Sequence, residues 1–319
     1  MAGVWILAEH HNQVLELLGV GRDLATKQGT RLTALIWDDR ERVQEYIDCG
    51  ADEVLLLAPP ASGQPPEAYV PVIVAEALTQ DPDIFLIEAT LRGKDMAARI
   101  AARLNTGLCS ECGGLTLDEK EDRLVMERLI YGGAAVQTLV CSTRPQMATI
   151  PPRAFAPAQP QGTRQGQVRE LPPPPPAAVR VIERKPKTRG TVSVAEAKVL
   201  VCVGRGIEKQ EDLELARELA GVIGGELCCT RPIAEELHWL PEETYIGLSG
   251  LKVKPDLYIG VGISGQIQHM TGIRDARVIC AINRDENAPI FEASDYGIVG
   301  DLYDVLPRLT GELKQALKK

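Results

Sequence analysis

The sequence predicts an α/β protein of two domains, each built on a mostly parallel sheet covered by helices. Three observations support this prediction. The chain has 319 residues, more than one domain of ordinary size needs. Short apolar segments alternate with segments of helical spacing over 4–104, and again over 198–317. A proline-rich stretch, 151–176, lies between the two series.

In the first domain, unbroken aliphatic segments predict strands that are buried on both faces. Apolar residues at spacings of three and four predict the helices between them. The predicted strands are 4–9, 32–37, 53–57 and 84–88. The predicted helices are 13–28, 40–49, 71–79 and 92–104.

The alternation of strand and helix patterns stops over 106–150. Short apolar runs lie between glycine pairs at 113–114 and 132–133. Glycine pairs favour turns, so this segment predicts antiparallel hairpins attached to the parallel sheet.

The proline-rich stretch 151–176 predicts a stiff linker, because its five consecutive prolines at 172–176 favour polyproline II. A basic segment, 185–189, follows and is expected to be exposed. We therefore assign 1–190 to the first domain, linker included, and 191–319 to the second.

The second domain repeats the alternation of strand and helix. Its predicted strands are 198–203, 227–229, 257–261, 278–283 and 296–299. Its predicted helices are 209–223, which ends at a glycine pair, and 302–317.

Composition argues against several classes of protein. Asp and Glu number 44 against 35 Lys and Arg, and the net charge of -9 argues against nucleic acid as a partner. No apolar run reaches the roughly 18 residues that a membrane span needs. The start of the chain lacks the features of a signal peptide, and eight dispersed cysteines suit a reducing compartment. We expect a cytoplasmic protein without membrane insertion.

The clearest local motif is Gly260-Val-Gly262-Ile-Ser-Gly265, which follows a predicted strand and matches G-x-G-x-x-G. Glycines let a backbone approach a phosphate, and a helix N-terminus favours the anion. The motif lies in the middle of its domain rather than at the first strand-to-helix turn. By itself it leaves open an NAD site and a purely structural turn.

Further motifs surround this loop. They are Gly204-Arg-Gly206, Thr230-Arg-Pro232, Ile246-Gly-Leu-Ser-Gly250, Val253-Lys-Pro255, 262–269, Ala281-Ile-Asn-Arg-Asp285, Ala288-Pro-Ile-Phe291 and 295–302. In this order and spacing the series closely resembles the α subunit of electron-transfer flavoproteins, over essentially all of 199–318. The first domain matches this family more loosely, through 4–9, 50–52, Leu91-Arg-Gly-Lys-Asp95 and 147–149.

The resemblance implies a heterodimer with an electron-transfer flavoprotein β subunit, against which the first domain packs. The second domain is then a Rossmann-like domain that binds FAD. The chain would be an electron carrier rather than an enzyme, and its FAD would carry electrons singly from a flavin-dependent dehydrogenase of the acyl-CoA type. Electron bifurcation, with a second FAD in the β subunit and NADH as donor, stays open. The alternative is an NAD-dependent oxidoreductase that uses the loop 260–265.

The resemblance also implies a role for individual residues. Arg231 corresponds to an arginine stacked beside the isoalloxazine, Ser249 to a hydroxyl that bonds flavin N5, and His269 to a histidine near flavin O2. Asn283 and Asp301 correspond to residues that bind the adenosine half. The expected cofactor-binding residues are Arg205, Thr230, Arg231, Gly247, Leu248, Ser249, Gly250, Gly262, Ser264, Gly265, Gln266, Ile267, Gln268, His269, Asn283, Asp301 and Leu302.

Elementary electrostatics favours the same residues. Reduced flavin is anionic, so a cation or donor beside it raises its potential. Arg231 keeps its charge at any working pH, and N–H groups at the start of a helix after Gly262 add a field of the same sign. Leu248 and Ser249 depart from a family pattern of Gln-Thr, since leucine offers no side-chain donor. This departure bears on the flavin potential rather than on binding.

Other candidates receive structural interpretations. Cys109 and Cys112 have the spacing of a redox disulfide or half a zinc site, but no second pair follows, so we expect two structural thiols. Cys228 and Cys229 are expected in a buried strand. The pair at 10–11 is expected at a solvated strand end, and no metal site is expected.

Overall fold

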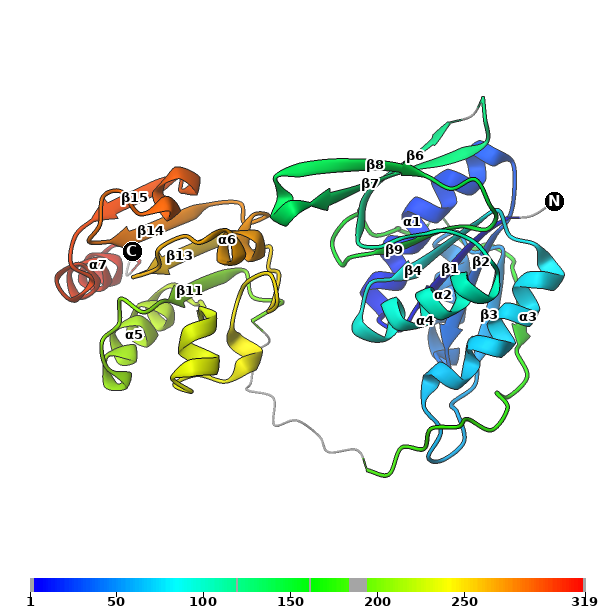
Figure 1. The fold of residues 1–319 in the computed structure, drawn as a ribbon, viewed down its shortest axis with the longest axis horizontal. Helices are drawn as coiled ribbons and strands as arrows, with labels where there is room; N and C mark the ends of the chain where they lie inside the picture. Colours follow the sequence, from blue (N-terminus) through cyan, green and yellow to red (C-terminus); the bar gives the residue numbers. More distant parts are fainter. Residues whose placement is uncertain (1–2, 119, 161, 184–193, 318–319) are drawn as a thin grey trace. The chain divides into compact units, whose positions relative to one another are not determined.

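The structure is a computed structural model that describes residues 3–118, 120–160, 162–183 and 194–317. The chain divides into two compact units, 1–185 and 186–319 (Figure 1). Each unit has its own parallel sheet between helices and its own hydrophobic cores. The predicted α/β class with mostly parallel, helix-covered sheets is confirmed. Among the described residues, no helix has both the length and the apolar character that a membrane span requires.

The first unit contains a seven-stranded parallel sheet in the order β10-β3-β2-β1-β4-β9-β5. Its strands are β1 (Val4–Ala8), β2 (Leu32–Trp37), β3 (Glu53–Leu57), β4 (Ile84–Glu88), β5 (Leu108–Cys109), β9 (Gln146–Ile150) and β10 (Gln167–Glu170). Alternate residues of β1 face opposite cores, with Ile6 in one and Trp5 in the other. Both faces are therefore apolar, which explains the unbroken aliphatic segments.

Helices cover both faces of this sheet (Figure 1). They are α1 (His11–Gln28), α2 (Val43–Asp48), α3 (Val70–Gln80) and α4 (Leu91–Arg103). The helices α1 and α2 pack into the core that contains Ile6, whereas α3 and α4 pack into the core that contains Trp5. Thr90 begins α4, because its hydroxyl accepts the Gly93 N–H at 2.9 Å.

The hairpin segment forms a separate three-stranded antiparallel sheet of β6 (Cys112–Asp118), β7 (Arg123–Ile130) and β8 (Ala135–Val140). The second glycine pair, 132–133, makes the turn between β7 and β8 with positive φ angles. The first pair, 113–114, does not make a turn. It lies inside β6, where the register with β7 shifts at a bulge.

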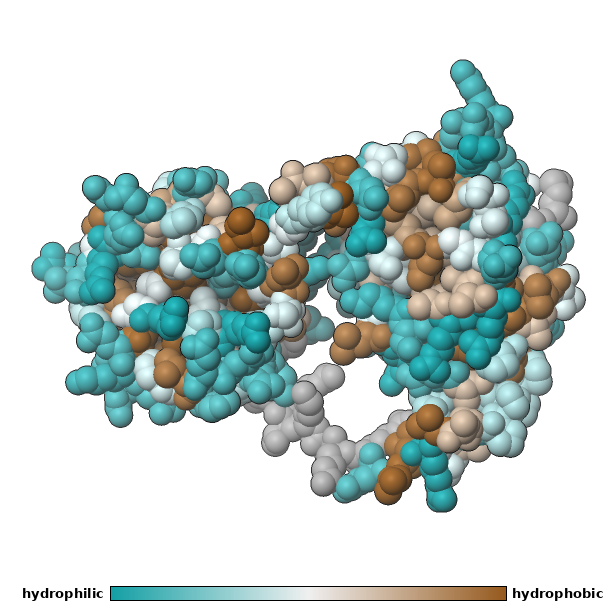
Figure 2. All heavy atoms as spheres, viewed as in Figure 1, coloured by the Kyte–Doolittle hydropathy of each residue, from teal (hydrophilic) through white to brown (hydrophobic). Residues whose placement is uncertain are grey.

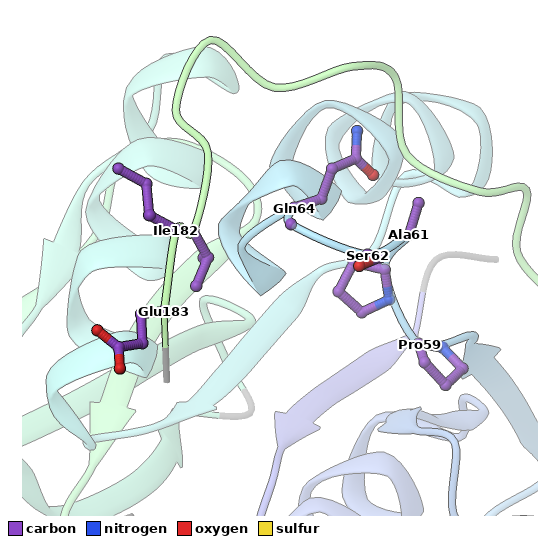
Figure 3. A pocket seen from close by; sticks show the side chains of 9 residues that line it. Pro59, Ala61, Ser62, Gln64, Ile182 and Glu183 are labelled. Carbon is purple, nitrogen blue, oxygen red and sulfur yellow. The ribbon is translucent and has the colours of Figure 1, made fainter. Parts of the chain in front are cut away.

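The predicted linker is partly wrong, because β10 lies inside the stretch 151–176 and extends the first sheet beside β3. Arg169 of β10 forms ion pairs with Glu53 and Glu76. The chain beyond the prolines turns back along the same unit, where 59–64 and 181–183 line an open cavity of about 390 Å³ (Figure 3). None of the predicted cofactor residues lines this cavity. The basic segment 185–189 lies outside the described residues.

The second unit contains a five-stranded parallel sheet in the order β12-β11-β13-β14-β15. The strands are β11 (Val199–Val203), β12 (Glu226–Cys229), β13 (Leu257–Val261), β14 (Ile279–Asn283) and β15 (Tyr296–Val299). The chain runs outward from β11 to β12 and then returns to the other side of β11. The reversal point of this sheet therefore lies between β11 and β13.

The helices α5 (Leu213–Ile223) and α7 (Leu302–Ala316) share one core of this unit, and α6 (Ile267–Ile273) packs into the other. The short helix α6 begins within the motif 262–269, where a helix start was predicted. A single π-helical turn, Pro232–Glu236, was not predicted. A π-helical turn is rare, and it often marks a functional site.

Candidate cofactor site

Most predicted cofactor residues lie at the carboxyl ends of strands in the second sheet. The strands and the residues at or after their ends are β11 with 204–206, β12 with Thr230 and Arg231, β13 with 262–269, β14 with Asn283, and β15 with Asp301 and Leu302. All neighbouring strands are parallel, so these loops meet at one edge. Such an edge, at the reversal point, is where open α/β sheets bind ligands.

The two glycine loops at this edge pack backbone against backbone. The Gly206 N–H donates to the Gly262 carbonyl at 3.0 Å. A Cβ on Gly262 would lie 2.7 Å from the Gly206 Cα, and a Cβ on Gly265 would lie 2.1 Å from the Ile290 nitrogen. Gly262 and Gly265 also have φ angles of +61° and +88°. Glycine is therefore required here by packing and by conformation.

The same loop keeps donors available for a ligand. Within the described residues, the backbone N–H groups of Ser264 to Ile267 have no acceptor in the chain, while the Ser264 carbonyl accepts the Ile290 N–H at 3.1 Å. Asn283 supports the loop, because its side-chain amide donates to the Ile263 carbonyl at 2.8 Å. A row of free N–H groups on a glycine-shaped loop fits a pyrophosphate.

The segment Gly247–Gly250 does not follow a strand, but it folds against α6 beside the motif. The Leu248 N–H donates to the Gln268 carbonyl at 2.7 Å, while the Leu248 side chain is exposed. The Ser249 hydroxyl accepts the Tyr245 O–H at 3.0 Å, which leaves the serine proton to donate elsewhere. The bond from Tyr245 thus fixes the Ser249 hydroxyl as a hydrogen-bond donor next to the glycine loop.

Arg231 and Arg205 both lie at the exposed rim of this edge, whereas Thr230 is buried. The Arg231 guanidinium bonds the Glu235 carboxylate at 2.5 Å across the π-helical turn. The hydrogen bond to Glu235 raises the pKa of Arg231, so the cation persists at every working pH. Its side chain is 64% exposed, which leaves the planar group accessible to a ring.

His269, which the resemblance relates to a histidine near flavin O2, is enclosed by the protein. The imidazole is buried, its Nδ1 lies 3.0 Å from the Ile246 carbonyl, and its Nε2 lies 2.7 Å from the Tyr258 hydroxyl. Both ring nitrogens are therefore bonded within the protein. Sequence reasoning missed Tyr258, which lies in an apolar strand, and Tyr245, which directly precedes the motif 246–250 without being part of it.

Other singled-out residues lie in the first unit, apart from this edge. Cys109 and Cys112 are buried, and the hydrogen bond from Cys112 lowers the pKa of Cys109. His10 bonds the buried Glu88 carboxylate, and His11 bonds Tyr46, so the pair is not simply a solvated strand end. Among the described residues, no group of three His, Cys, Asp or Glu side chains could hold a metal ion.

Comparison with known proteins supports this location. A family model described as an electron transfer flavoprotein domain matches residues 4–176, and one described as an electron transfer flavoprotein FAD-binding domain matches residues 193–274. The second match covers β11 to α6 and therefore includes both glycine loops.

Relatives match nearly the whole chain. The protein FixB of Clostridium saccharobutylicum is 38% identical over 325 residues, which are 99% of this chain and 97% of that protein. The electron transfer flavoprotein subunit alpha of Clostridium acetobutylicum is 36% identical over 338 residues, with 98% and 97% covered. The protein FixB of Escherichia coli O81 (strain ED1a) is 35% identical over 316 residues, with 97% of each covered.

A thiamin diphosphate-dependent enzyme from Mycobacterium smegmatis matches with a TM-score of 0.24 and 11% identity, over 97% of this chain and 59% of that chain, and a score this low carries no argument. The family models and the full-length relatives agree with each other and with the sheet edge described above. The chain therefore belongs to the family of electron-transfer flavoprotein alpha subunits, and the cofactor of its second unit is FAD.

Proposed function

We propose that this chain pairs with a β subunit and that the pair carries electrons singly between a flavin-dependent dehydrogenase, of the acyl-CoA type, and a second redox partner. The observation that supports it best is the shared edge of the second sheet, where glycine-shaped backbone, a directed hydroxyl and a permanent cation converge. FAD, when bound, accepts and releases the electrons. The residues of the chain bind it, orient it and set its electrostatic surroundings.

The proposed binding roles follow the geometry. The free N–H groups of 264–267 hold the pyrophosphate, with Asn283 supporting the loop. Asp301 caps α7 through the Tyr303 N–H at 2.9 Å and, with Leu302, bounds the adenosine end. The remaining contacts come from Arg205, Thr230, Gly247, Leu248, Gly250, Gly262, Gly265, Gln266 and Gln268.

At the flavin end, we assign Ser249 as the donor to the ring and Arg231 as the cation beside it. The Ser249 proton is free because its oxygen already accepts from Tyr245. Arg231 makes the reduced, anionic flavin more stable, which raises the potential. His269 belongs to this end as a buried neighbour of the loop.

The first unit supplies a surface for the β subunit. The antiparallel sheet exposes apolar side chains on and beside β7 and β8, and apolar residues gather over this hairpin in Figure 2. They are Leu129, Tyr131, Val136 and Val140. Exposed apolar groups of this kind mark protein contacts, so we propose that this sheet contributes to the β-subunit contact.

No observation favours the NAD-dependent alternative. It needs an acid or base free beside the loop 260–265, and the imidazole that lies there, His269, has both nitrogens bonded. Bifurcation depends on residues of the β subunit, so the stoichiometry of the complex tests it: two FAD per pair favour bifurcation over simple transfer. We place the carrier in the cytoplasm, where the dispersed thiols would stay reduced.

Expression of the chain with and without its β subunit tests the proposal. The coexpressed pair should be yellow, contain FAD and accept electrons from an acyl-CoA dehydrogenase, as followed by flavin bleaching. The chain alone should bind FAD weakly or be poorly soluble, because one side of the flavin needs the partner. A stable, FAD-saturated chain that turns over NADH with a small substrate, without a β subunit, would contradict it.

A further inference from the structure

Four polar side chains are buried together under the segment Ile246–Gly250. Cys202 on β11 and Cys228 on β12 are register partners, and Tyr258 on β13, the register partner of Leu200, lies in the same core. His269 on α6 completes the group. Tyr258 and both cysteines are fully buried, and His269 is 7% exposed. Burying so many polar groups is costly unless their hydrogen bonds are satisfied.

The partners of His269 determine which of its nitrogens carries the proton. A carbonyl oxygen only accepts, so the nitrogen that faces the Ile246 carbonyl, Nδ1, must carry a hydrogen. In the neutral ring Nε2 is then the acceptor, and the Tyr258 hydroxyl is its donor at 2.7 Å. Burial, reinforced by the two cysteines, raises the pKa of Tyr258 well above its ordinary value, so this hydroxyl keeps its proton.

Cys202 competes for the same proton. Burial raises the pKa of this thiol, but Cys228 and the other polar groups beside it outweigh burial and lower its pKa overall. Sulfur is nevertheless a weak acceptor compared with an imidazole nitrogen. The Tyr258 proton is therefore directed to Nε2 rather than to sulfur.

The ring connects this buried group to the segment that carries Ser249. Its Nδ1 proton bonds the residue directly before Gly247, and the neighbouring Gln268 carbonyl accepts the Leu248 N–H at 2.7 Å. A Cβ on Gly272 of α6 would lie only 2.6 Å from the Gly247 nitrogen, so the two segments are in close contact. Rotation of the imidazole ring would break its hydrogen bond to the Ile246 carbonyl, which is one of the bonds that hold Ile246–Gly250 against α6.

We propose that Tyr258 is a positioning residue for the flavin end of the site. Its hydroxyl holds His269 as the neutral tautomer with hydrogen on Nδ1, and His269 in turn fixes Ile246–Gly250 against α6. The inference rests on the proposed function only in placing this segment at the flavin. The tautomer itself is a property of the chain without cofactor.

The first test observes the tautomer directly in the FAD-free pair with its β subunit. When only this chain of the pair is labelled with ¹⁵N-histidine, its four histidines give few ring signals, and a His269→Gln sample identifies those of His269. The ¹⁵N shifts tell which nitrogen carries hydrogen. We expect hydrogen on Nδ1 and none on Nε2, and a mixture in Tyr258→Phe. Hydrogen on Nε2 in the unaltered protein would overturn the proposal.

The second test is a double-mutant cycle on the FAD dissociation constant. Tyr258→Phe leaves a buried acceptor unpaired and should weaken FAD binding about tenfold. The same change in a His269→Leu background should weaken it less than about twofold, because Tyr258 acts through the ring. Equal losses in both backgrounds would contradict positioning. His269→Phe, which keeps a ring but lacks both nitrogens, provides a second background if the leucine variant does not fold.

Tyr46→Phe is the matched control, because Tyr46 is also a buried tyrosine whose hydroxyl bonds a histidine, His11, but in the first unit. It should change neither the His269 signals nor FAD affinity. If Tyr258→Phe alters the ring signals but not FAD affinity, the tautomer assignment holds and the placement of Ile246–Gly250 at the flavin is wrong.

Discussion

The carboxyl edges of the two parallel sheets differ in what fills the reversal point. In the second unit that point lies between β11 and β13, and two glycine loops leave backbone N–H groups free. In the first unit it lies between β1 and β4, and charged side chains fill it. The Glu88 carboxylate accepts the N–H groups of Glu9 and His10 at 2.7 and 3.3 Å. Similar topology therefore supports a ligand site in one unit. In the other unit the same place is filled by the charged side chains of Glu9, Glu88 and Arg92, which we call the plug.

The plug in the first unit is built from opposite charges. Arg92 at the start of α4 bonds Glu9 and Glu67, and Thr90 donates to Glu9 at 3.0 Å. The cavity left there is about 10 Å³, room for no more than a water molecule. A buried carboxylate takes the N–H groups that an anion would otherwise use. The side chains at a sheet edge thus decide whether a shared topology is open to a ligand.

Gly265→Ala should give the largest effect on the open edge. The new Cβ would lie 2.1 Å from the Ile290 nitrogen, at a φ angle that alanine rarely adopts. The loop must shift, so FAD affinity in the coexpressed pair should fall about a hundredfold. Gly221→Ala in α5 is the control, since nothing lies within 4 Å of its added Cβ. Equal FAD binding by both variants, measured by fluorescence quenching, would show that the loop is not at the cofactor.

Glu88→Ala tests the closed edge. The backbone N–H groups of Glu9 and His10 and the His10 ring lose a buried partner, so the first unit should lose about 2–3 kcal/mol of its free energy of unfolding. Urea denaturation measures the loss, with Glu121→Ala, which removes an exposed carboxylate away from this edge, as the control. Inorganic phosphate should restore part of the stability at constant ionic strength, because the freed N–H groups suit an anion. If Glu88→Ala leaves the free energy of unfolding unchanged, the plug is not what closes this edge.

Arg231→Ala and Glu235→Gln should move the flavin potential in opposite directions. Removing the cation should lower the midpoint potential by roughly 60 mV, a tenfold change in a one-electron equilibrium. Removing the paired carboxylate should raise it by less, because the pair is exposed to water. Spectroelectrochemical titration compares both with Arg231→Lys, which keeps the charge but loses the plane. Identical potentials in all variants would place Arg231 away from the flavin.

The sequence predicted buried parallel strands well, because burial on both faces leaves an unbroken aliphatic signal. The bounds of β2, β3, β4, β13 and β15 agree with the predictions residue for residue. It failed for β10, whose residues Gln167–Glu170 are all exposed at an edge. That strand forms through pairing with β3 and through Arg169, and neither leaves an apolar pattern.

For the cofactor site, the motifs located the glycine loops but not the side chains that support them. Sequence order cannot show that Tyr258 reaches His269, because this depends on how β13 and α6 pack. Nor does the sequence show that Glu235 forms an ion pair with Arg231, since that pairing needs the π-helical turn. Glu88 ends an ordinary strand in the sequence, and only the fold reveals it as a plug.

The smallest effect is expected for Cys109→Ser combined with Cys112→Ser, which asks whether the first unit has any redox role. The Cys112 thiol donates to the Gly114 carbonyl at 3.0 Å and lowers the pKa of Cys109 beside it. A serine hydroxyl can keep the bond to Gly114, so the free energy of unfolding should change by no more than about 1 kcal/mol. FAD content, midpoint potential and zinc content of the pair should equal those of the unaltered protein. Zinc lost in stoichiometric amount, or a large shift in potential, would restore the metal or disulfide interpretation. The first unit would then contribute to electron transfer rather than only to assembly.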